Sequence, residues 1–254
     1  MLAHQWHSDS GIPVVFLHGF LGSRHDWQEV IGYLQKFPQI RPLVIDLPFH
    51  HQSSHIACHH FDEMRTLFHA TLQQLGEENF YLVGYSLGGR IVLDYALNVA
   101  NPYLKGVLLE GANIGLATQK EKEARWQNDC VWAERFATEP LRNVLKDWYQ
   151  QAVFSDLNFA KRHDIIEKRL DNDGKSLAQM LKATSLAKQS YFAPKQIKHS
   201  ASPIKFIIGE RDQKFRQMVE QHQLAHHLIP NAGHNAHIEN PQAFAEYLVN
   251  FILP

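Results

Sequence analysis

The sequence has little cysteine, no excess of either charge and no long apolar run. Its only cysteines, Cys58 and Cys130, cannot form a disulfide framework and show no zinc-type pairing. With 25 basic and 26 acidic residues, the chain lacks the positive excess that nucleic acids or anionic membranes usually require. No segment approaches the roughly 18 apolar residues of a membrane-spanning helix, and residues 1–7 lack a signal-peptide pattern. We therefore expect a soluble, cytoplasmic protein with reduced thiols.

Short apolar runs alternate with helical patterns along most of the chain. Most runs are apolar throughout, as strands covered on both faces are, and they predict strands at 14–17, 42–45, 80–83, 106–109, 204–208 and 225–229. Helices are predicted at 61–75, directly after Ser86, and from the capping pair at 240–241. The alternation indicates an α/β fold with a mainly parallel sheet and helices on both faces.

Residues 113–189 interrupt this alternation, because amphipathic helical patterns replace the strand patterns there. One such helix follows the starter at 138–140 (TEP). We expect residues 113–189 to form a helical lid, inserted late in the sheet of a single domain that spans 1–254.

A reactive serine is predicted at the end of the strand at 80–83. Residues 84–89 (GYSLGG) carry the pattern G-x-S-x-G between that strand and a helix. The small flanking residues permit a very sharp turn, and the helix dipole favours negative charge developing at Ser86. We therefore expect Ser86 to carry the chemistry.

A serine needs an imidazole and an orienting acid to react at neutral pH. Asp212 and His234 each follow a predicted strand, and the three residues occur along the chain in the order Ser, Asp, His that is expected with the G-x-S-x-G motif. All three residues thus fall at the sheet edge where ligands bind. Glu210 and His237 remain alternatives, although the loop positions favour Asp212 and His234.

An oxyanion would also need two N–H donors. The N–H of Leu87, directly after the serine, is one, and we assign the second to Phe20 in the loop after the first long strand. His18 in the same loop is interpreted as structural.

Histidines gather between residues 50 and 60. His50, His51, His55, His59 and His60 surround Cys58, but no carboxylate or thiolate recurs at ligand spacing. We interpret the segment as a solvated loop and expect neither a metal nor a cofactor.

Several cations are predicted near the serine. Arg90 lies one helical turn after Ser86 and would bind a substrate carboxylate, unless it pairs with a core acid. Lys214 follows Asp212 closely, while Arg125 and Arg169 belong to the lid, where many arginines are simply solvated. Together they suggest a small substrate with several carboxylates.

At this point the sequence resembles a known family. Residues 84–90 (GYSLGGR), 209–215 (GERDQKF) and 232–237 (AGHNAH) are similar to motifs of the bacterial 2-succinyl-6-hydroxy-2,4-cyclohexadiene-1-carboxylate synthases of menaquinone biosynthesis, which have the α/β-hydrolase fold. Residues 147–151 (DWYQQ) and 183–187 (ATSLA) extend the likeness into the lid. One departure follows residues 46–48 (DLP): the family continues with glycine, histidine and glycine, and this chain with Phe49, His50 and His51.

The resemblance implies a lyase that eliminates pyruvate from 2-succinyl-5-enolpyruvyl-6-hydroxy-3-cyclohexene-1-carboxylate, a substrate with three carboxylates. Ser86 would act as base, and the N–H groups of Phe20 and Leu87 would hold the enolate, without an acyl-enzyme. The implied pocket residues are Tyr85, Arg90, Arg125, Trp148, Tyr149, Arg169 and Lys214.

Two other functions stay open. The same residues could serve a hydrolase of esters or carbon–carbon bonds, because one triad supports many reactions. A ligand-binding protein with an inactive triad is the other alternative, and the complete set of Ser86, Asp212 and His234 argues against it. We expect a monomer that acts on a small molecule without nucleic-acid or membrane partners.

Overall fold

Seven strands form one sheet in the order β1-β3-β2-β4-β5-β6-β7 in the computed structural model, which describes residues 1–253. The strands are β1 (His4–Trp6), β2 (Ile12–Leu17), β3 (Ile40–Ile45), β4 (Phe80–Tyr85), β5 (Leu104–Glu110), β6 (Ile204–Gly209) and β7 (His226–Ile229). Only β1 runs antiparallel to its neighbour, so the predicted α/β fold with a mainly parallel sheet is confirmed. All six predicted strands are present, whereas the short and partly polar β1 was missed.

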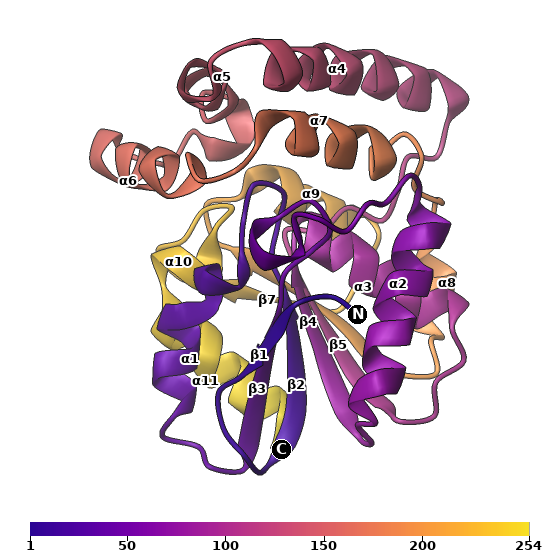
Figure 1. Cartoon of the computed structure of the whole chain (residues 1–254). Helices are drawn as coiled ribbons and strands as arrows, with labels where there is room; N and C mark the ends of the chain where they lie inside the picture. Colours follow the sequence, from indigo (N-terminus) through magenta and orange to yellow (C-terminus); the bar gives the residue numbers. More distant parts are fainter. Residues whose placement is uncertain (254) are drawn as a thin grey trace.

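Helices cover both faces of this sheet (Figure 1). They are α1 (Gln28–Leu34), α2 (Phe61–Leu75), α3 (Leu87–Asn98), α8 (Pro194–Lys198), α9 (Gln213–Gln221), α10 (Ala236–Glu239) and α11 (Pro241–Ile252). Strand side chains alternate between the faces, so Val14 and Phe16 join the core under α1 and α11, while Val15 and Leu17 join the core under α2 and α3. The two cores fix the sheet and hence the positions of the strand ends.

The elements between β5 and α8 are all helical. They are α4 (Gln119–Thr138), α5 (Leu141–Trp148), the 3-10 helix η3 (Ala152–Phe154), α6 (Phe159–Arg169) and α7 (Gly174–Ala183). These helices lie beyond one end of the strands, above the rest of the fold in Figure 1. Their apolar cluster also takes in Leu21, from the loop after β2, so the insertion packs directly on that loop.

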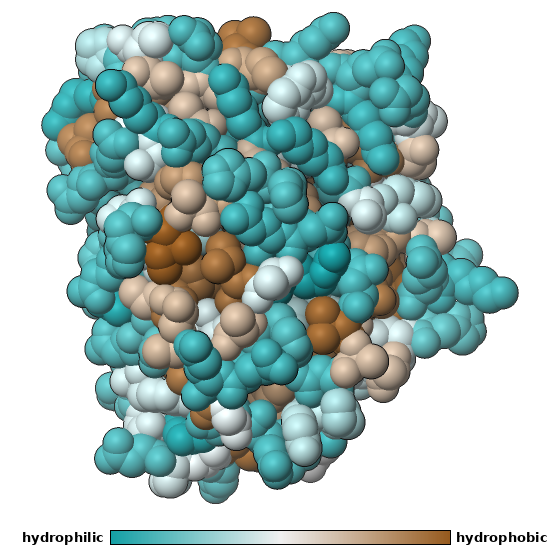
Figure 2. Space-filling view, turned by 45° about the vertical axis from the view of Figure 1, so that its right-hand side comes forward, coloured by the Kyte–Doolittle hydropathy of each residue, from teal (hydrophilic) through white to brown (hydrophobic). Residues whose placement is uncertain are grey.

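The face of the molecule in Figure 2 is mostly hydrophilic, with small apolar patches between charged side chains. Through residue 253, none of the helices combines the length and apolar character that crossing a bilayer requires.

Candidate active site

Ser86 lies in a strained turn between β4 and α3. Its backbone angles are φ 49° and ψ −107°, a conformation that residues other than glycine rarely adopt. The turn is held because the Ser86 N–H donates to the Glu110 carbonyl at 2.8 Å. A Cβ at Gly88 would overlap the carbonyl of Leu17, which explains the small residue at this position of the motif.

His234 and Asp212 form a buried pair at the ends of β7 and β6. His234 Nδ1 lies 2.8 Å from Asp212 Oδ2, and the side chains are 5% and 3% exposed. The imidazole stacks on Phe215 at 5.1 Å, and a Cβ at Gly111 would lie 2.6 Å from its Cε1. The ring is thus held between Gly111 and Phe215, with Nδ1 occupied by the carboxylate.

The alternatives to this pair are engaged elsewhere. Glu210 is exposed and accepts a hydrogen bond from the Asn231 N–H at 3.2 Å. His237 is fully buried and bonds through Nδ1 to Glu110 at 2.9 Å. Neither side chain contributes to the lining of the cavity that contains Ser86.

Ser86 and His234 line one cavity of about 140 Å³. Because Asp212 takes Nδ1, Nε2 is the nitrogen left to receive the serine proton. Among residues 1–253, however, no hydrogen bond links Ser86 Oγ to His234. The hydrogen bond between Asp212 and His234 is formed in this structure, whereas the one between Ser86 and His234 is not.

The same cavity contains the two expected oxyanion donors, Phe20 and Leu87. Leu87 is the first residue of α3, where helix N–H groups have no partner within the helix. Within the described chain neither N–H donates to a protein acceptor, although the N–H groups of Leu21 and Gly22 do. Neither N–H is therefore engaged by a protein acceptor within residues 1–253, as a role in binding a ligand would require.

Three of the predicted cations reach this cavity. Arg90 donates to the Thr184 carbonyl at 2.9 Å and to Gln189 Oε1 at 3.3 Å, and it has no carboxylate partner among residues 1–253. Burial lowers the pKa of Arg90 to about 9, and the charge of Arg125 adds to this effect. Lys214 is exposed at the cavity rim. A core ion pair for Arg90, the alternative considered from the sequence, is not what the structure contains.

Arg125 and Trp148 also line the cavity, both from the helical insertion. Arg125 Nε lies 2.7 Å from Asp129, one turn further along α4, so its charge is partly compensated. The ring of Trp148 packs 5.3 Å from that of Phe20, so it connects the insertion to the loop after β2.

Three other predicted pocket residues do not line this cavity. Tyr85 is buried beneath it, with its ring 5.3 Å from His234 and 4.6 Å from His237. Arg169 instead binds Asp26 through both terminal nitrogens, at 2.7 and 2.8 Å, and Tyr149 is buried beside it. The structure thus places Arg169, a lid arginine that the resemblance assigned to the pocket, in an ion pair with Asp26 and outside the lining of the Ser86 cavity.

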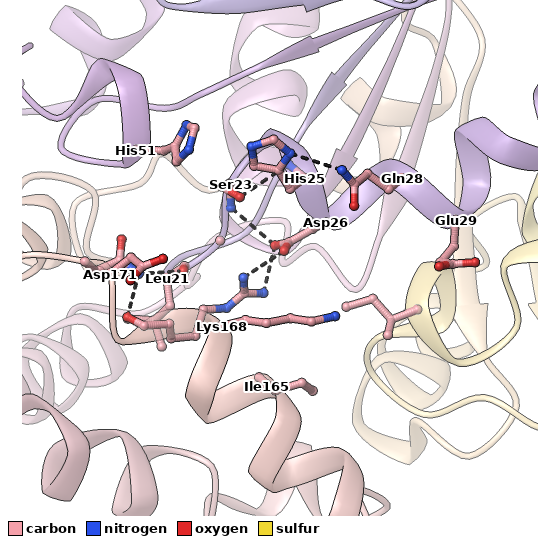
Figure 3. Close-up of a pocket in the computed structure, with 14 residues that line it drawn as sticks. Leu21, Ser23, His25, Asp26, Gln28, Glu29, His51, Ile165, Lys168 and Asp171 are labelled. Carbon is pink, nitrogen blue, oxygen red and sulfur yellow. Dashed lines mark hydrogen bonds and ion pairs between the residues drawn. The ribbon is translucent and has the colours of Figure 1, made fainter.

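Arg169 and Asp26 border a separate hollow of about 430 Å³, which Figure 3 shows. Asp26 follows Ser23 closely in the chain, and its carboxylate faces the helix that carries Ile165 (Figure 3). The ion pair thus joins the 3-10 helix η1 (Arg24–Trp27) to α6 of the insertion. We call this Arg169–Asp26 ion pair the latch, because it connects the helical insertion to the loop region that follows β2.

The histidine-rich segment is only in part the solvated loop that we expected. His50 is fully buried, whereas His51, His55, His59 and His60 are exposed. Burial also raises the pKa of the Cys58 thiol to about 11. Residues 1–253 hold no group of three or more side chains placed to bind a metal ion.

Sequence reasoning missed three polar residues that line the cavity, Asn113, Gln151 and Thr184. Gln151 and Thr184 lie within the two insertion segments that carried the family resemblance. Asn113 follows β5 closely, so its position past a strand end was the signal that could have found it.

Comparison with known proteins bears on the family and the fold of the chain. The sequence profile of the alpha/beta hydrolase fold family matches residues 12–241. A 2-succinyl-6-hydroxy-2,4-cyclohexadiene-1-carboxylate synthase of Serratia proteamaculans is 43% identical over 240 residues, covering 94% of this chain and 92% of the relative. One of Yersinia pseudotuberculosis is 43% identical over 246 residues, covering 97% and 89%. The solved MenH structure from S. aureus superposes with a TM-score of 0.88 at 26% identity, covering 99% and 98% of the two chains.

Proposed function

Because this chain belongs to the alpha/beta hydrolase fold family, and within it to the 2-succinyl-6-hydroxy-2,4-cyclohexadiene-1-carboxylate synthases, we propose that Ser86, His234 and Asp212 carry out its pyruvate elimination. The reaction is the lyase step of menaquinone biosynthesis, and its substrate is a small molecule. The observation that carries the residue assignment is the 2.8 Å Asp212–His234 pair, whose imidazole shares a cavity with Ser86.

The proposed reaction begins with proton removal. Ser86 Oγ passes its own proton to His234 Nε2 and takes the ring proton next to the succinyl ketone, while Asp212 stabilises the imidazolium. The electron pair left on carbon moves onto the ketone oxygen as an enolate, which accepts hydrogen bonds from the N–H groups of Phe20 and Leu87. When the enolate collapses, the ring double bond shifts and the carbon–oxygen bond to the enolpyruvyl group breaks. The departing enolpyruvate oxygen keeps the electron pair of that bond and receives the proton that His234 Nε2 had taken from the serine, while the substrate proton stays on Ser86 Oγ. The released enol tautomerises to pyruvate, and the conjugated diene is the second product.

Charge around the cavity supports a substrate rich in carboxylates. Arg90, Arg125 and Lys214 line it together, and Arg90 has no acid of its own among the described residues. A buried guanidinium without an anionic partner is costly, so a substrate carboxylate that reaches Arg90 would gain a charge-assisted hydrogen bond. We assign Arg90 to one carboxylate and leave Arg125 and Lys214 for the others.

The helical insertion, residues 113–189, acts in this proposal as a lid that supplies Arg125 and Trp148 to the cavity within one domain. The cytoplasmic location and the monomeric state expected from the sequence stay predictions.

The test is to mix the protein with the enolpyruvyl cyclohexene substrate and to follow pyruvate and the conjugated diene together. We expect both products to appear at the same rate, and Ser86→Ala to abolish most of that rate. The hydrolase alternative predicts burst release of the alcohol from short aryl esters. Such a burst with no pyruvate from the cyclohexene would contradict the lyase mechanism.

Replacing Arg90 by methionine should raise KM about 10- to 100-fold, because a charge-assisted hydrogen bond contributes about 1.5–3 kcal/mol. Methionine keeps most of the apolar stem, so the packing above Phe61 is largely retained. Steady-state kinetics of pyruvate release measure the effect. Arg142→Met is the matched control, since that exposed arginine pairs only with Glu167 on the surface. An Arg90 variant with an unchanged KM would remove the carboxylate assignment.

A further inference from the structure

The loop that carries the Phe20 donor, residues 18–22, is held by two buried imidazoles. His18 Nδ1 donates to the Gly19 carbonyl at 2.8 Å, and the Gly22 N–H donates to the same carbonyl at 3.0 Å. The C=O and N–H of a trans peptide point in opposite directions, so fixing the Gly19 carbonyl turns the Phe20 N–H the other way. The Phe20 donor is therefore aimed by its own peptide unit.

The next peptide unit is held by His50. The Leu21 N–H donates to His50 Nε2 at 3.2 Å, and Asn172 of the insertion donates to the Leu21 carbonyl at 3.1 Å. Leu21 has φ 71°, a left-handed conformation that a branched side chain adopts only when its surroundings impose it. The bond from His50 thus supports a strained backbone directly next to Phe20.

The hydrogen bonds of His50 also define its protonation. Its Nδ1 lies 2.8 Å from the Pro48 carbonyl, which can only accept, so Nδ1 carries the proton and Nε2 is the acceptor. Burial lowers the pKa of His50 to about 3, and the neighbouring His18 adds to this. The ring is fully buried, 5.1 Å from that of His18 and 6.0 Å from that of Phe20. His50 therefore stays neutral and keeps its acceptor toward Leu21.

We propose that His50 is a positioning residue of the oxyanion hole: it fixes the peptide between Phe20 and Leu21, and together with His18 on the preceding peptide it keeps the Phe20 N–H in place at the cavity. The inference rests on the proposed function, because it assigns the enolate to that N–H. It goes beyond that function by giving a role to a residue of the histidine-rich segment that does not line the cavity. If the loop relaxed, the ground state would still bind through Arg90, but the enolate would lose part of its stabilisation.

Three substitutions at His50 separate this role from simple packing. A glutamine amide reaches the position of Nε2 and can accept from the Leu21 N–H, whereas asparagine reaches only the position of Nδ1, and leucine offers no acceptor. All three variants lose the ring contacts with His18 and Phe20, so their midpoint temperatures of thermal unfolding should fall by similar amounts. His55→Leu, at an exposed histidine of the same segment, is the matched control.

We expect His50→Asn and His50→Leu to lower kcat for pyruvate release about 10- to 100-fold, less than the 10²–10³ of a deleted oxyanion donor, because the donor is misdirected and not removed. KM should stay within about twofold, since ground-state binding is untouched. His50→Gln should keep kcat within about threefold of wild type, because the acceptor remains. Equal losses of kcat in the glutamine and asparagine variants, or a change confined to KM, would overturn the proposal.

A second readout does not depend on activity. In histidine labelled with ¹⁵N, the His50 resonances, identified by their loss in His50→Gln, should show a neutral ring protonated on Nδ1 at pH 7. A ring protonated on Nε2, or on both nitrogens, could not accept the hydrogen bond from the Leu21 N–H, and this result would refute the positioning role of His50. If the wild-type protein released no pyruvate, the proposed function would be wrong. The spectrum would still test whether the His50 ring can accept the hydrogen bond from Leu21.

Discussion

Replacing Ser86 by alanine should lower kcat for pyruvate release by about 10²- to 10⁴-fold, the usual contribution of a positioned acid–base group. KM should change little, because Arg90 and the other polar groups that line the cavity remain in place. Stopped-flow detection of the conjugated diene would measure the rate, with Ser54→Ala as a control at an exposed serine. A Ser86→Ala protein that retained more than a tenth of the wild-type kcat would show that another group removes the proton.

The same experiment can test whether the triad acts as a unit. His234 has Asp212 on Nδ1, so its remaining role in the proposal is to accept the Ser86 proton on Nε2. Once Ser86 is alanine, removing His234 as well should cost little more, since groups that act together have strongly non-additive effects. The double variant Ser86→Ala/His234→Ala should therefore match the slower single variant within about threefold. Losses that multiply would mean that His234 acts independently of the serine.

The places of Ser86, Asp212 and His234 just past the ends of strands could be predicted from the sequence because they depend on local patterns. Apolar runs mark the strands, and in a parallel sheet the residues that follow those runs meet at one edge. Ser86 needed only its own glycine-rich turn to be recognised, and that turn is strained as the motif predicts.

Residues whose roles depend on distant partners could not be placed in this way. Arg169 and Asp26 are 143 residues apart, and nothing in the periodicity of α6 identifies the carboxylate that its arginine meets. His50 lies among exposed histidines, so its segment reads as polar and solvated. Its ring accepts from the Leu21 N–H, 29 residues earlier in the chain, and no local pattern identifies that partner.

The Arg169–Asp26 latch leads to the second large expected effect, on stability. Both side chains are 7% exposed, and replacing Asp26 by asparagine would leave the buried guanidinium without its counter-charge. We expect the free energy of unfolding to fall by about 3–5 kcal/mol at pH 7, as when one partner of a buried pair is removed. Urea unfolding followed by tryptophan fluorescence would measure it. Glu167→Gln breaks an exposed pair with Arg142 and should cost no more than about 1 kcal/mol.

The latch should also make the wild-type protein sensitive to acid in a defined direction. Burial alone would raise the pKa of Asp26, but the charge and hydrogen bonds of Arg169 outweigh it, and the pKa in the folded chain is lowered. A carboxyl whose folded pKa lies below its unfolded value of about 3.9 contributes its stability above that value and loses it as the pH falls through the folded pKa. The difference in unfolding free energy between wild type and Asp26→Asn should therefore have its full value at pH 6–7 and become smaller below about pH 4. A difference that stayed constant down to pH 3, or a variant as stable at pH 7 as Glu167→Gln, would contradict the latch, because the paired carboxylate would then contribute nothing to holding the insertion on the sheet.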